Sequence, residues 1–375
     1  MMDDALPEEW EILRSWLPED LNARARQQQF FRRARGLNDG ERWLRIILMH
    51  VAGGLSLEQT ALRARELGLA QISGVALFKR LRNSGAWLQD LCQHLLAEQQ
   101  RRLGGCAWPS EYQVRAIDAT AVQEPGSTGT AWRIHYSIRL PELICDHYEL
   151  TDHRGGEKLG RFHFAKAELI LADRGYSHRA GAAKVLASGA ALLLRWNPAI
   201  LPVKGPGGQA FNLLGKLRRL PKRGAQEWPV QFAHEGKTYF LRLCAIRKNR
   251  LATERARRKA MDKARRNGTQ AQPQSLELTH YILVLTSLAA KFSCRQVLEL
   301  YRCRWQIELA FKRLKTLLGA GHVPKSDDQS ARAWMQAKIL TALLLERLLL
   351  EAKIFSPWGY HLPDLEPLAL DVGSP

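Results

Sequence analysis

The sequence predicts a mixed α/β protein, in which an all-α N-terminal domain precedes an α/β core and a mostly β insertion interrupts that core. Residues from about 8 to 103 form one helix-like segment after another, separated by glycines and with hardly a β-branched run. Short strand-like runs begin at Tyr112. From about 197 to 286, prolines, glycines and alternating polar and apolar residues break this plan, and helical periodicity returns afterwards.

The N-terminal domain contains helix boundaries that can be recognised from single residues. Ser56 and Gln59 have the spacing of the Ser/Thr-x-x-Glu/Gln capping box. We expect a short helix to follow and to end at Gly68, and Ser73 can cap a second helix over 75–82. Two short helices joined by a glycine-containing turn resemble a helix-turn-helix.

The second of these helices is basic. It carries Lys79, Arg80 and Arg82, which suit contacts with phosphate oxygens or guanine edges. The alternative is an ordinary helical hairpin with a solvated basic face, because such hairpins are common. We predict that these three side chains contact DNA.

The core is predicted to open with three successive strands, followed by a glycine-rich connection at 155–160 and then by further strands and a helix. This order fits the opening of a ribonuclease H-like α/β domain, although periodicity alone does not single out that fold. The expected elements are strands at Gln113–Val122, Trp132–Leu140, 143–151 and Glu168–Ala172, a helix at 178–188 and a strand at 190–196.

The insertion combines strand-like segments at 227–232 and 237–246 with a basic run at 247–266. Only Glu254 and Asp262 interrupt the positive charge of that run. Solvated helix faces also carry such runs, but the scarcity of acidic residues favours a phosphate backbone as the partner. Its basic residues are Arg247, Lys248, Arg250, Arg255, Arg257, Arg258, Lys259, Lys263, Arg265 and Arg266.

Two helices are expected to close the chain, one from Cys294 to about Leu318 and one over 330–353. On the first, Tyr301, Arg304, Glu308 and Lys315 fall within a wedge of roughly 60° on one helix face. A carboxylate beside an aromatic ring and two cations suits a site where Glu308 holds a metal and the cations hold phosphates. The alternative is a surface helix with an Arg304–Glu308 pair at i, i+4, which contributes only tenths of a kcal/mol.

Two further carboxylates stand where strands are expected. Asp118 lies within the strand-like run Val-Arg-Ala-Ile-Asp-Ala-Thr, and Asp173 directly follows a strand and begins Asp-Arg-Gly-Tyr. A carboxylate on a buried strand costs several kcal/mol unless a metal or cations compensate it. Asp173 could instead cap a turn before the next helix, which is a common use of aspartate.

The composition is that of a basic globular protein. The chain has 375 residues, a hydrophobic fraction of 46% and a formal net charge of +19. A polyanionic partner is therefore expected, although charge that only aids solubility remains an alternative.

The six cysteines include no Cys-x-x-Cys pair and no histidine pair at zinc-finger spacing, so we expect no structural zinc. The acidic start, Met-Met-Asp-Asp, and the lack of a long apolar run predict a cytoplasmic protein with no membrane span and with reduced thiols.

Several of these motifs together resemble the bacterial insertion-sequence-four family of DDE transposases. They are Asp118, the segment Gly-Thr-Ala-Trp-Arg-Ile-His-Tyr-Ser at 129–137, the Asp-Arg-Gly-Tyr that begins at Asp173, and the Tyr-x2-Arg-x3-Glu-x6-Lys helix that contains Glu308. The resemblance runs from about residue 40 to 350. Asp173 lies 55 residues after Asp118 and Glu308 a further 135 residues on, and the long second gap houses the β insertion that is typical of the family.

The resemblance implies a ribonuclease H-like catalytic core in which Asp118, Asp173 and Glu308 hold two Mg²⁺ ions, with Mn²⁺ as a substitute. It implies that Tyr301, Arg304 and Lys315 contact phosphates at the transposon ends, and we expect Arg174 to contact DNA as well. Members of the family often stack an aromatic side chain from the insertion on a flipped base, for which Tyr281 is the nearest candidate.

The expected function is therefore cut-and-paste transposition. The protein would bind terminal inverted repeats, cleave there and join the freed ends to target DNA, as a dimer in the DNA complex and with a hairpin intermediate as one route. It would act in the bacterial cytoplasm and would be associated with the nucleoid when bound to DNA. Two alternatives stay open at this point: a ribonuclease H-like nuclease without strand transfer, and a helix-turn-helix DNA-binding protein with an inactive core.

The predicted domain boundaries follow from these elements. They are a helical N-terminal DNA-binding domain at 1–108, the first part of the catalytic core at 109–196, the β insertion at 197–288, the second part of the core with the C-terminal helices at 289–355, and a C-terminal tail at 356–375.

Overall fold

The computed structural model of the chain describes residues 5–31, 37–102, 111–126, 131–140, 142–222, 224–324 and 327–354. The predicted C-terminal tail and the boundary at 108/109 lie outside these residues. Within them, no helix has the length and apolar character needed to cross a membrane.

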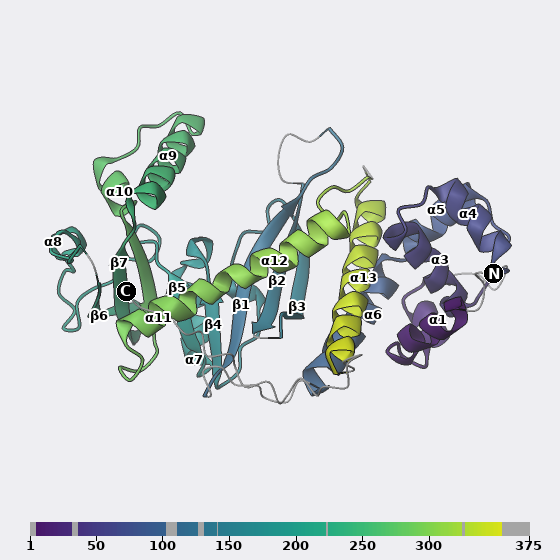
Figure 1. Cartoon of the computed structure of the whole chain (residues 1–375), viewed down its shortest axis with the longest axis horizontal. Coiled ribbons are helices and arrows are strands. Elements are labelled where there is room, and N and C mark those ends of the chain that lie inside the picture. The colour runs from purple at the N-terminus through teal and green to yellow at the C-terminus, as the bar shows by residue number, and fades with distance from the viewer. Residues whose placement is uncertain are drawn as a thin grey trace, which may run out of the picture.

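One eight-stranded sheet forms the centre of the molecule, in the order β3-β2-β1-β4-β5-β8-β7-β6 (Figure 1). Strands β1, β2 and β3 are antiparallel neighbours, while β4 and β5 run parallel to β1. The strands are β1 (Gln113–Val122), β2 (Trp132–Leu140), β3 (Ile144–Asp152), β4 (Glu168–Ala172), β5 (Ala191–Arg195), β6 (Ala225–His234), β7 (Lys237–Arg247) and β8 (Tyr281–Thr286).

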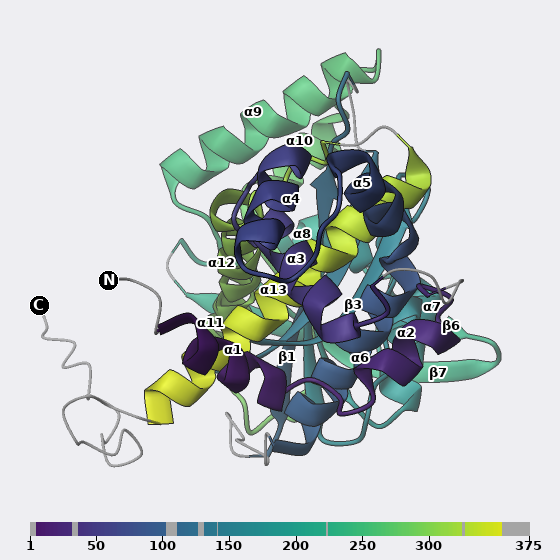
Figure 2. The ribbon, with the colours of Figure 1, turned by 90° about the vertical axis from the view of Figure 1, so that its right-hand side faces the viewer.

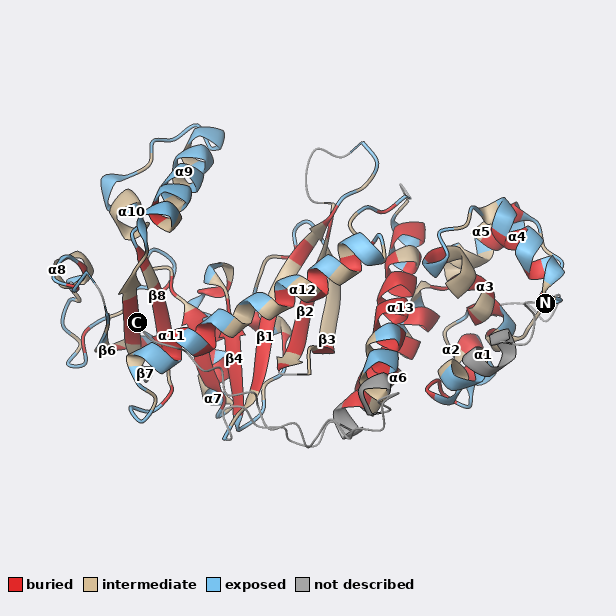
Figure 3. Ribbon diagram, viewed as in Figure 1, coloured by how far each residue is buried: buried red, intermediate tan, exposed pale blue. Residues whose placement is uncertain are grey.

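Helices cover both faces of this sheet because its strands bury side chains on both sides. On one face, Ala116 and Leu171 belong to the core that also contains Phe311. On the other face, Ile117 and Ile170 pack in a second core with the helix α7 (Arg179–Ala187). The central strands are accordingly buried along most of their length (Figure 3).

A helical segment from Cys294 to Leu317 crosses the first of these faces (Figure 1). It consists of α11 (Cys294–Arg302), a 3₁₀ turn (Cys303–Trp305), α12 (Gln306–Lys312) and a π-helical turn (Arg313–Leu317). The expected single helix is therefore present but irregular. Its start is fixed by a capping box between Ser293 and Gln296.

The residues between β5 and α11 were expected to form a mostly β insertion. They contain three strands, β6 to β8, which continue the central sheet, because β8 pairs with β5. They also contain three helices, and the longest of them, α9, is the basic run (Figure 1). The helices are α8 (Leu213–Arg218), α9 (Arg250–Arg266) and α10 (Pro273–Leu278).

The described residues up to 102 contain helices and no strand. Ser56 and Gln59 form the expected capping box, and Ser73 caps the following helix by accepting from the Ala76 N–H at 3.2 Å. The helices are α1 (Ala5–Ser15), α2 (Leu21–Gln27), α3 (Gly40–Ala52), α4 (Leu57–Glu66), α5 (Gly74–Asn83) and α6 (Gly85–Arg102).

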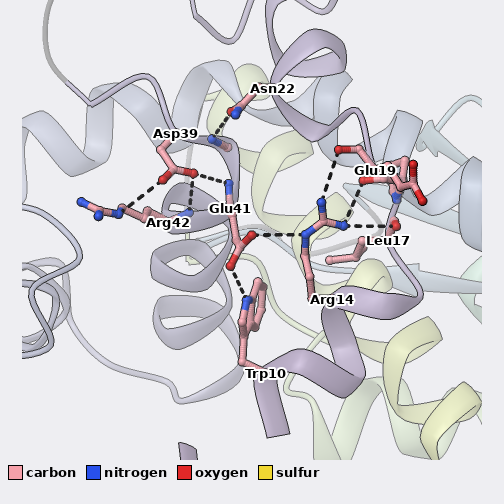
Figure 4. A network of polar contacts seen from close by, with 10 residues as sticks. Trp10, Arg14, Leu17, Glu19, Asn22, Asp39, Glu41 and Arg42 are labelled. Carbon is pink, nitrogen blue, oxygen red and sulfur yellow. Dashed lines mark hydrogen bonds and ion pairs between the residues drawn. The ribbon is translucent and has the colours of Figure 1, made fainter. Parts of the chain in front are cut away.

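A polar network fixes α1 and α2 to the start of α3 (Figure 4). Glu41 accepts hydrogen bonds from the indole of Trp10 at 2.7 Å and from Arg14 at 3.2 Å. Asp39 caps α3, and the Asn22 amide oxygen accepts from the Gly40 N–H at 2.6 Å. These hydrogen bonds join residues between Trp10 and Glu41, so the first three helices contact one another directly.

The last helix, α13 (Asp328–Ile354), lies between these N-terminal helices and the sheet (Figures 1 and 2). It packs on α6 and α5 on one side and on β3 on the other. Lys338 on α13 donates to the Val51 carbonyl at 2.6 Å. The N-terminal helices are thus packed onto the rest of the fold through a shared core.

Glu346 on α13 is a carboxylate held against the sheet. It accepts hydrogen bonds from the Tyr136 hydroxyl at 3.2 Å and from the Cys145 N–H at 2.9 Å. Burial raises the pKa of Glu346 to about 7, and these two hydrogen bonds and the positive charge of Arg313 offset only part of that effect.

This raised pKa predicts a pH dependence of stability. Between pH 4.5 and 7 the folded chain keeps a proton on Glu346 that the unfolded chain has lost, so the contribution of this residue to stability falls as the pH rises through that window. Glu346→Gln should therefore be more stable than the wild type at pH 8, by up to about 3 kcal/mol, and show no gain at pH 4.5. Urea unfolding at both pH values measures this, with the exposed Glu299→Gln as control; an equal effect of Glu346→Gln at both pH values would contradict it.

Candidate active site

Asp118 and Asp173 come together because β1 and β4 are parallel neighbours. Ile117 pairs with Ala172 in that register, so the two aspartates occupy the next positions along adjacent strands. Both also continue the strand alternation of Ala116 and Leu171, whose side chains lie in the core on the α12 side. The register therefore directs both carboxylates towards the helical segment that contains Glu308.

Arg304 joins Asp118 to Glu308. Its guanidinium donates to Asp118 Oδ2 at 3.0 Å and to Glu308 Oε1 at 2.9 Å. The Arg304 side chain is 12% exposed and that of Glu308 is 61% exposed. Arg304 and Glu308 are therefore more than a surface i, i+4 pair, because the same guanidinium also binds Asp118 on β1.

Tyr301 contacts Asp173, the remaining carboxylate of the three. It is buried, and its hydroxyl donates to Asp173 Oδ1 at 3.2 Å. Burial and the neighbouring Asp173 raise the pKa of Tyr301, so the phenol stays protonated and can keep donating. Tyr301 thus orients Asp173 in this structure, whereas the resemblance implies a contact with DNA phosphates.

The electrostatics of Asp118 indicate a need for cations. Burial raises its pKa to about 6, although the Ala119 N–H and Arg304 lower it. The negative charge of Asp173 adds to the increase. The guanidinium of Arg304 therefore compensates the buried charge of Asp118 incompletely.

Glu157 is a fourth carboxylate beside the site, and the sequence analysis missed it. It follows β3, and its Oε2 occupies the space that a Cβ on Gly175 would take. Burial raises the pKa of Glu157, and Asp173 raises it further while Arg133 lowers it. Nothing in the sequence around Glu157 resembles a motif, and only the folding of the connection after β3 places it here.

The donor set fits a hard divalent cation. Asp118, Asp173 and Glu308 offer only carboxylate oxygens, the ligands that Mg²⁺ and Mn²⁺ prefer. Within the described residues, however, their oxygens do not all lie within 4.8 Å of one another. Arg304 stands between two of them, since its guanidinium donates to both Asp118 and Glu308.

A basic cleft of about 720 Å³ begins at Arg174, next to Asp173, and extends to α9. Arg174, Arg195 and Lys248 line it on the sheet side, and Lys259 and Lys263 line it on α9. Burial lowers the pKa of Lys248 to about 8, and Arg195 and Arg174 lower it further, so these cations are crowded together. The cleft is suited to a polyanion.

The basic run itself divides into two parts. Arg247 and Lys248 are tied down, since Arg247 donates to the Leu220 carbonyl at 3.2 Å and Lys248 donates to the Thr279 carbonyl at 2.9 Å. Along α9 the basic side chains are exposed, and only Thr253 is buried (Figure 3).

A second cleft of about 630 Å³ lies along the start of the Glu308 helix. Arg195, Arg302 and Arg304 line it together with Trp305, whose surface is 49% exposed. Tyr281, the aromatic residue suggested by the sequence for stacking on a base, is only 5% exposed and lies under the Arg247 guanidinium. Of the aromatic residues that line this cleft, Tyr301 is buried and Trp305 is accessible.

Lys315 stands apart from the other motif residues of its helix. It is half-buried in the π-helical turn, and its stem faces Gly321, which would bring a Cβ there within 3.4 Å of it. The carbonyl of Gly321 accepts from the Gln123 N–H at 3.3 Å, just beyond β1. The 3₁₀ and π turns change the helical phase, so the single 60° wedge expected for a regular helix does not apply.

The three basic residues predicted on the second N-terminal helix have different surroundings. Lys79 is exposed. Arg80 donates to the Phe30 carbonyl at 3.1 Å and lies over the Trp43 ring. Arg82 donates to Gln329 at 2.9 Å and lies 3.5 Å from Asp327. Lys79 is thus the most accessible of the three, and Arg80 has a packing role.

Comparison with known proteins identifies the family of the chain. Residues 149–345, a span that contains Asp173 and Glu308, match the transposase DDE domain family. The chain is 33% identical to the transposase for insertion sequence element IS421 from Escherichia coli, over 91% of this chain and 93% of that protein. It is 33% identical, over the same shares, to the InsL protein of insertion sequence element IS186A from Escherichia coli (strain K12).

Among solved structures, a cryo-EM structure of the piggyBac transposase synaptic complex with hairpin DNA is similar at a TM-score of 0.43 and 10% sequence identity, over 92% of this chain and 73% of that chain. That likeness is too distant to carry an argument. The family match and the 33% identity along nearly the whole length show that the chain belongs to the DDE transposases of bacterial insertion sequences. These enzymes cut DNA and transfer its strands.

Proposed function

We propose that this transposase cuts and joins DNA at Asp118, Asp173 and Glu308, on a ribonuclease H-like core. The observation that carries the proposal is that one helical segment reaches all three carboxylates: Arg304 joins Asp118 on β1 to Glu308 on α12, and Tyr301 donates to Asp173 at the end of β4. The core assignment is supported by the order β3-β2-β1-β4-β5, with β4 and β5 parallel to β1. The helices up to residue 102 would form the N-terminal DNA-binding domain.

These three residues would hold two Mg²⁺ ions, which supply activation of the attacking oxygen and stabilisation of the leaving oxygen when bound. In the first step, water attacks the phosphorus at the element end, and the P–O3′ bond breaks to leave a 3′-hydroxyl. In the second, that hydroxyl attacks a target phosphate and one P–O bond replaces another. Tyr301 holds Asp173 in place during both steps, and Arg304 holds backbone phosphate.

The surfaces around the carboxylates support a path for DNA. The cleft from Arg174 to α9 would take the phosphate backbone, and the exposed face of α9 would add non-specific affinity. Trp305 can stack on an exposed base beside the cut. Lys79 on α5 would contribute to recognition of the terminal inverted repeats.

Transposition joins two element ends, so we propose a dimer in the DNA complex, with one set of carboxylates for each end. The protein would act in the bacterial cytoplasm, at the nucleoid when bound to DNA. The hairpin route follows only from the family resemblance and is tested with Arg304 in the Discussion.

The function is tested by incubating the protein with Mg²⁺, DNA that carries the inverted repeats flanking its gene, and a target plasmid. We expect end cleavage followed by covalent joining of the freed 3′ ends to the plasmid. Cleavage without joined product would favour a nuclease without strand transfer. Binding without cleavage would favour a DNA-binding protein with an inactive core.

The role of the basic cleft gives a separate prediction. Lys259→Ala/Lys263→Ala removes two of its cations, and we expect weaker non-specific DNA binding with a salt dependence reduced by about 2 in the slope of log K against log salt. The matched control, Arg258→Ala/Arg265→Ala, removes two exposed charges of α9 that do not line the cleft. Equal losses for the two double variants in a salt titration would show that α9 binds DNA without the cleft.

A further inference from the structure

A cluster of two thiols and a carboxylate lies at the start of the helix that leads to Glu308. Cys294 is the first residue of α11, Cys244 lies on β7 and Glu227 lies on β6. Glu227 and Cys244 are directly opposite each other in the antiparallel register. They therefore point to the same face of the sheet, the face on which α11 begins.

The three potential ligand atoms are close together. Both sulfurs and a Glu227 carboxylate oxygen all lie within 4.8 Å of one another. Cys244 Sγ is 3.8 Å from Glu227 Oε2. Two sulfurs bound to a tetrahedral zinc at about 2.3 Å lie about 3.8 Å apart, so little movement is needed for all three atoms to reach one ion.

The surroundings favour a cation that binds thiolate. Each thiol donates to an oxygen beside the other ligands: Cys244 donates to Glu227 Oε2 at 3.8 Å, and Cys294 donates to the Gln226 carbonyl at 3.3 Å. Both thiols lose these protons when they bind a cation as thiolates. Burial also keeps Cys244 away from solvent, which slows its oxidation.

Arg242 supplies an orienting contact around this cluster. It donates to Glu227 Oε2 at 2.7 Å and to the Phe292 carbonyl at 2.9 Å, two residues before α11. Two thiolates and one carboxylate with a divalent cation carry a net charge of −1, which Arg242 neutralises. Hydrogen-bonded partners of this kind fix the ligands of protein metal sites.

We propose that Glu227, Cys244 and Cys294 bind a thiophilic divalent cation of the Zn²⁺ class, with water as the fourth ligand. This site is separate from the three active-site carboxylates in chemistry, because thiolates select zinc whereas all-oxygen sets select Mg²⁺. It would tie the first turn of α11 to β6 and β7, and so fix the base of the helical segment that contains Arg304 and Glu308.

Sequence spacing cannot reveal such a site. Zinc motifs are recognised when ligands stand a few residues apart, as in Cys-x-x-Cys. These ligands come from three elements and only the sheet register and the packing of α11 bring them together. The expectation of no structural zinc rested on spacing alone.

Cobalt(II) absorption tests the proposal without any measurement of DNA cleavage. Co²⁺ is added to the reduced, metal-free full-length protein, because thiolate ligation gives an intense sulfur-to-cobalt charge-transfer band that carboxylate ligation does not. We expect the band at one Co²⁺ per chain, its loss on addition of Zn²⁺, and the release of protons as the thiols ionise.

Cys294→Ser is the decisive variant because Cys294 is only partly buried and serine replaces only its sulfur atom with oxygen. We expect it to lose the charge-transfer band, and Glu227→Gln to keep the band at about tenfold lower affinity or weaker. Cys303→Ser, which changes another partly exposed cysteine of the same helical segment, should behave as the wild type.

Three results would overturn the proposal. The first is the absence of a charge-transfer band in the reduced wild type, and the second is an unchanged band in Cys294→Ser. The third is a wild type that loses two titratable thiols to a Cys244–Cys294 disulfide under mild oxidation while binding no Co²⁺ when reduced, which would identify a redox pair instead.

Discussion

Replacing Asp118, Asp173 or Glu308 by alanine is expected to abolish cleavage at the insertion-sequence ends and to leave end binding intact. The expected loss of rate is on the order of 10³-fold or more, because removing even one electrostatic contact with a transition state costs about 10²- to 10³-fold. Binding should survive because these side chains hold metal and read no base. A labelled end substrate measures both effects, by denaturing gel for cleavage and by native gel for binding.

The chain offers a matched control for Glu308. Glu299 lies on the same helical segment and forms an i, i+4 pair with Arg295, as Glu308 does with Arg304. Glu299→Ala should cleave at the wild-type rate. Robust cleavage by any one of the three carboxylate variants with Mg²⁺ would remove that residue from the active site.

The second large effect is expected for Arg304→Ala. Arg304 lies between Asp118 and Glu308 and is mostly buried, so it is placed to hold a backbone phosphate beside the scissile bond. We expect the first nick to remain largely intact, and hairpin formation and later steps to fall by about 10²-fold, since bent DNA depends on bidentate guanidinium contacts. Denaturing gels separate nick, hairpin and resolved product.

Further variants test the same role of Arg304. Arg304→Lys should recover only part of the activity, because an ammonium group lacks the planar fork that serves two acceptors. Lys315→Ala should be milder, since Lys315 lies apart from the carboxylates. The exposed Arg295→Ala is the control, and wild-type amounts of all three products from Arg304→Ala would identify Arg304 as a structural ion-pair residue.

Much of the core could be predicted from the sequence because its local signals agree. The expected strands Gln113–Val122, Trp132–Leu140 and Glu168–Ala172 coincide with β1, β2 and β4. Each is an apolar run bounded by turn residues, and caps such as Ser56 and Ser73 depend only on neighbouring residues.

The sequence did not reveal which strands pair across long separations. That β8 lies between β5 and β7, and so extends the central sheet, follows from contacts between residues about 90 apart, such as Leu193 with Thr286. Periodicity indicates that a segment is a strand but does not identify its partner. The insertion therefore appeared from the sequence to be a separate β region.

In the active site, too, local signals reveal some residues, whereas the contacts between distant segments could not be predicted. Asp118 and Asp173 could be recognised because each interrupts or ends a buried run where a charge is costly, and Glu308 because it belongs to a helix motif with an aromatic residue and two cations. The contacts of Tyr301 with Asp173, of Arg304 with Asp118 and of Glu157 with Gly175 all join distant segments, and no local pattern predicts them. The burial of Tyr281 and the exposure of Trp305 likewise depend on the packing of distant segments and could not be predicted from the sequence.

The most direct test of the central claim locates the metal in the chain. Fe²⁺ bound in place of Mg²⁺ generates hydroxyl radicals with ascorbate and peroxide, and these cut the polypeptide next to the ion. In a Cys294→Ser background, which removes the proposed thiolate site, we predict fragments that end near Asp118, Asp173 and Glu308. Excess Mg²⁺ and the change Asp173→Asn should each suppress them. Cutting only at other positions, or cutting that Asp173→Asn leaves unchanged, would contradict a metal centre at the ends of β1 and β4.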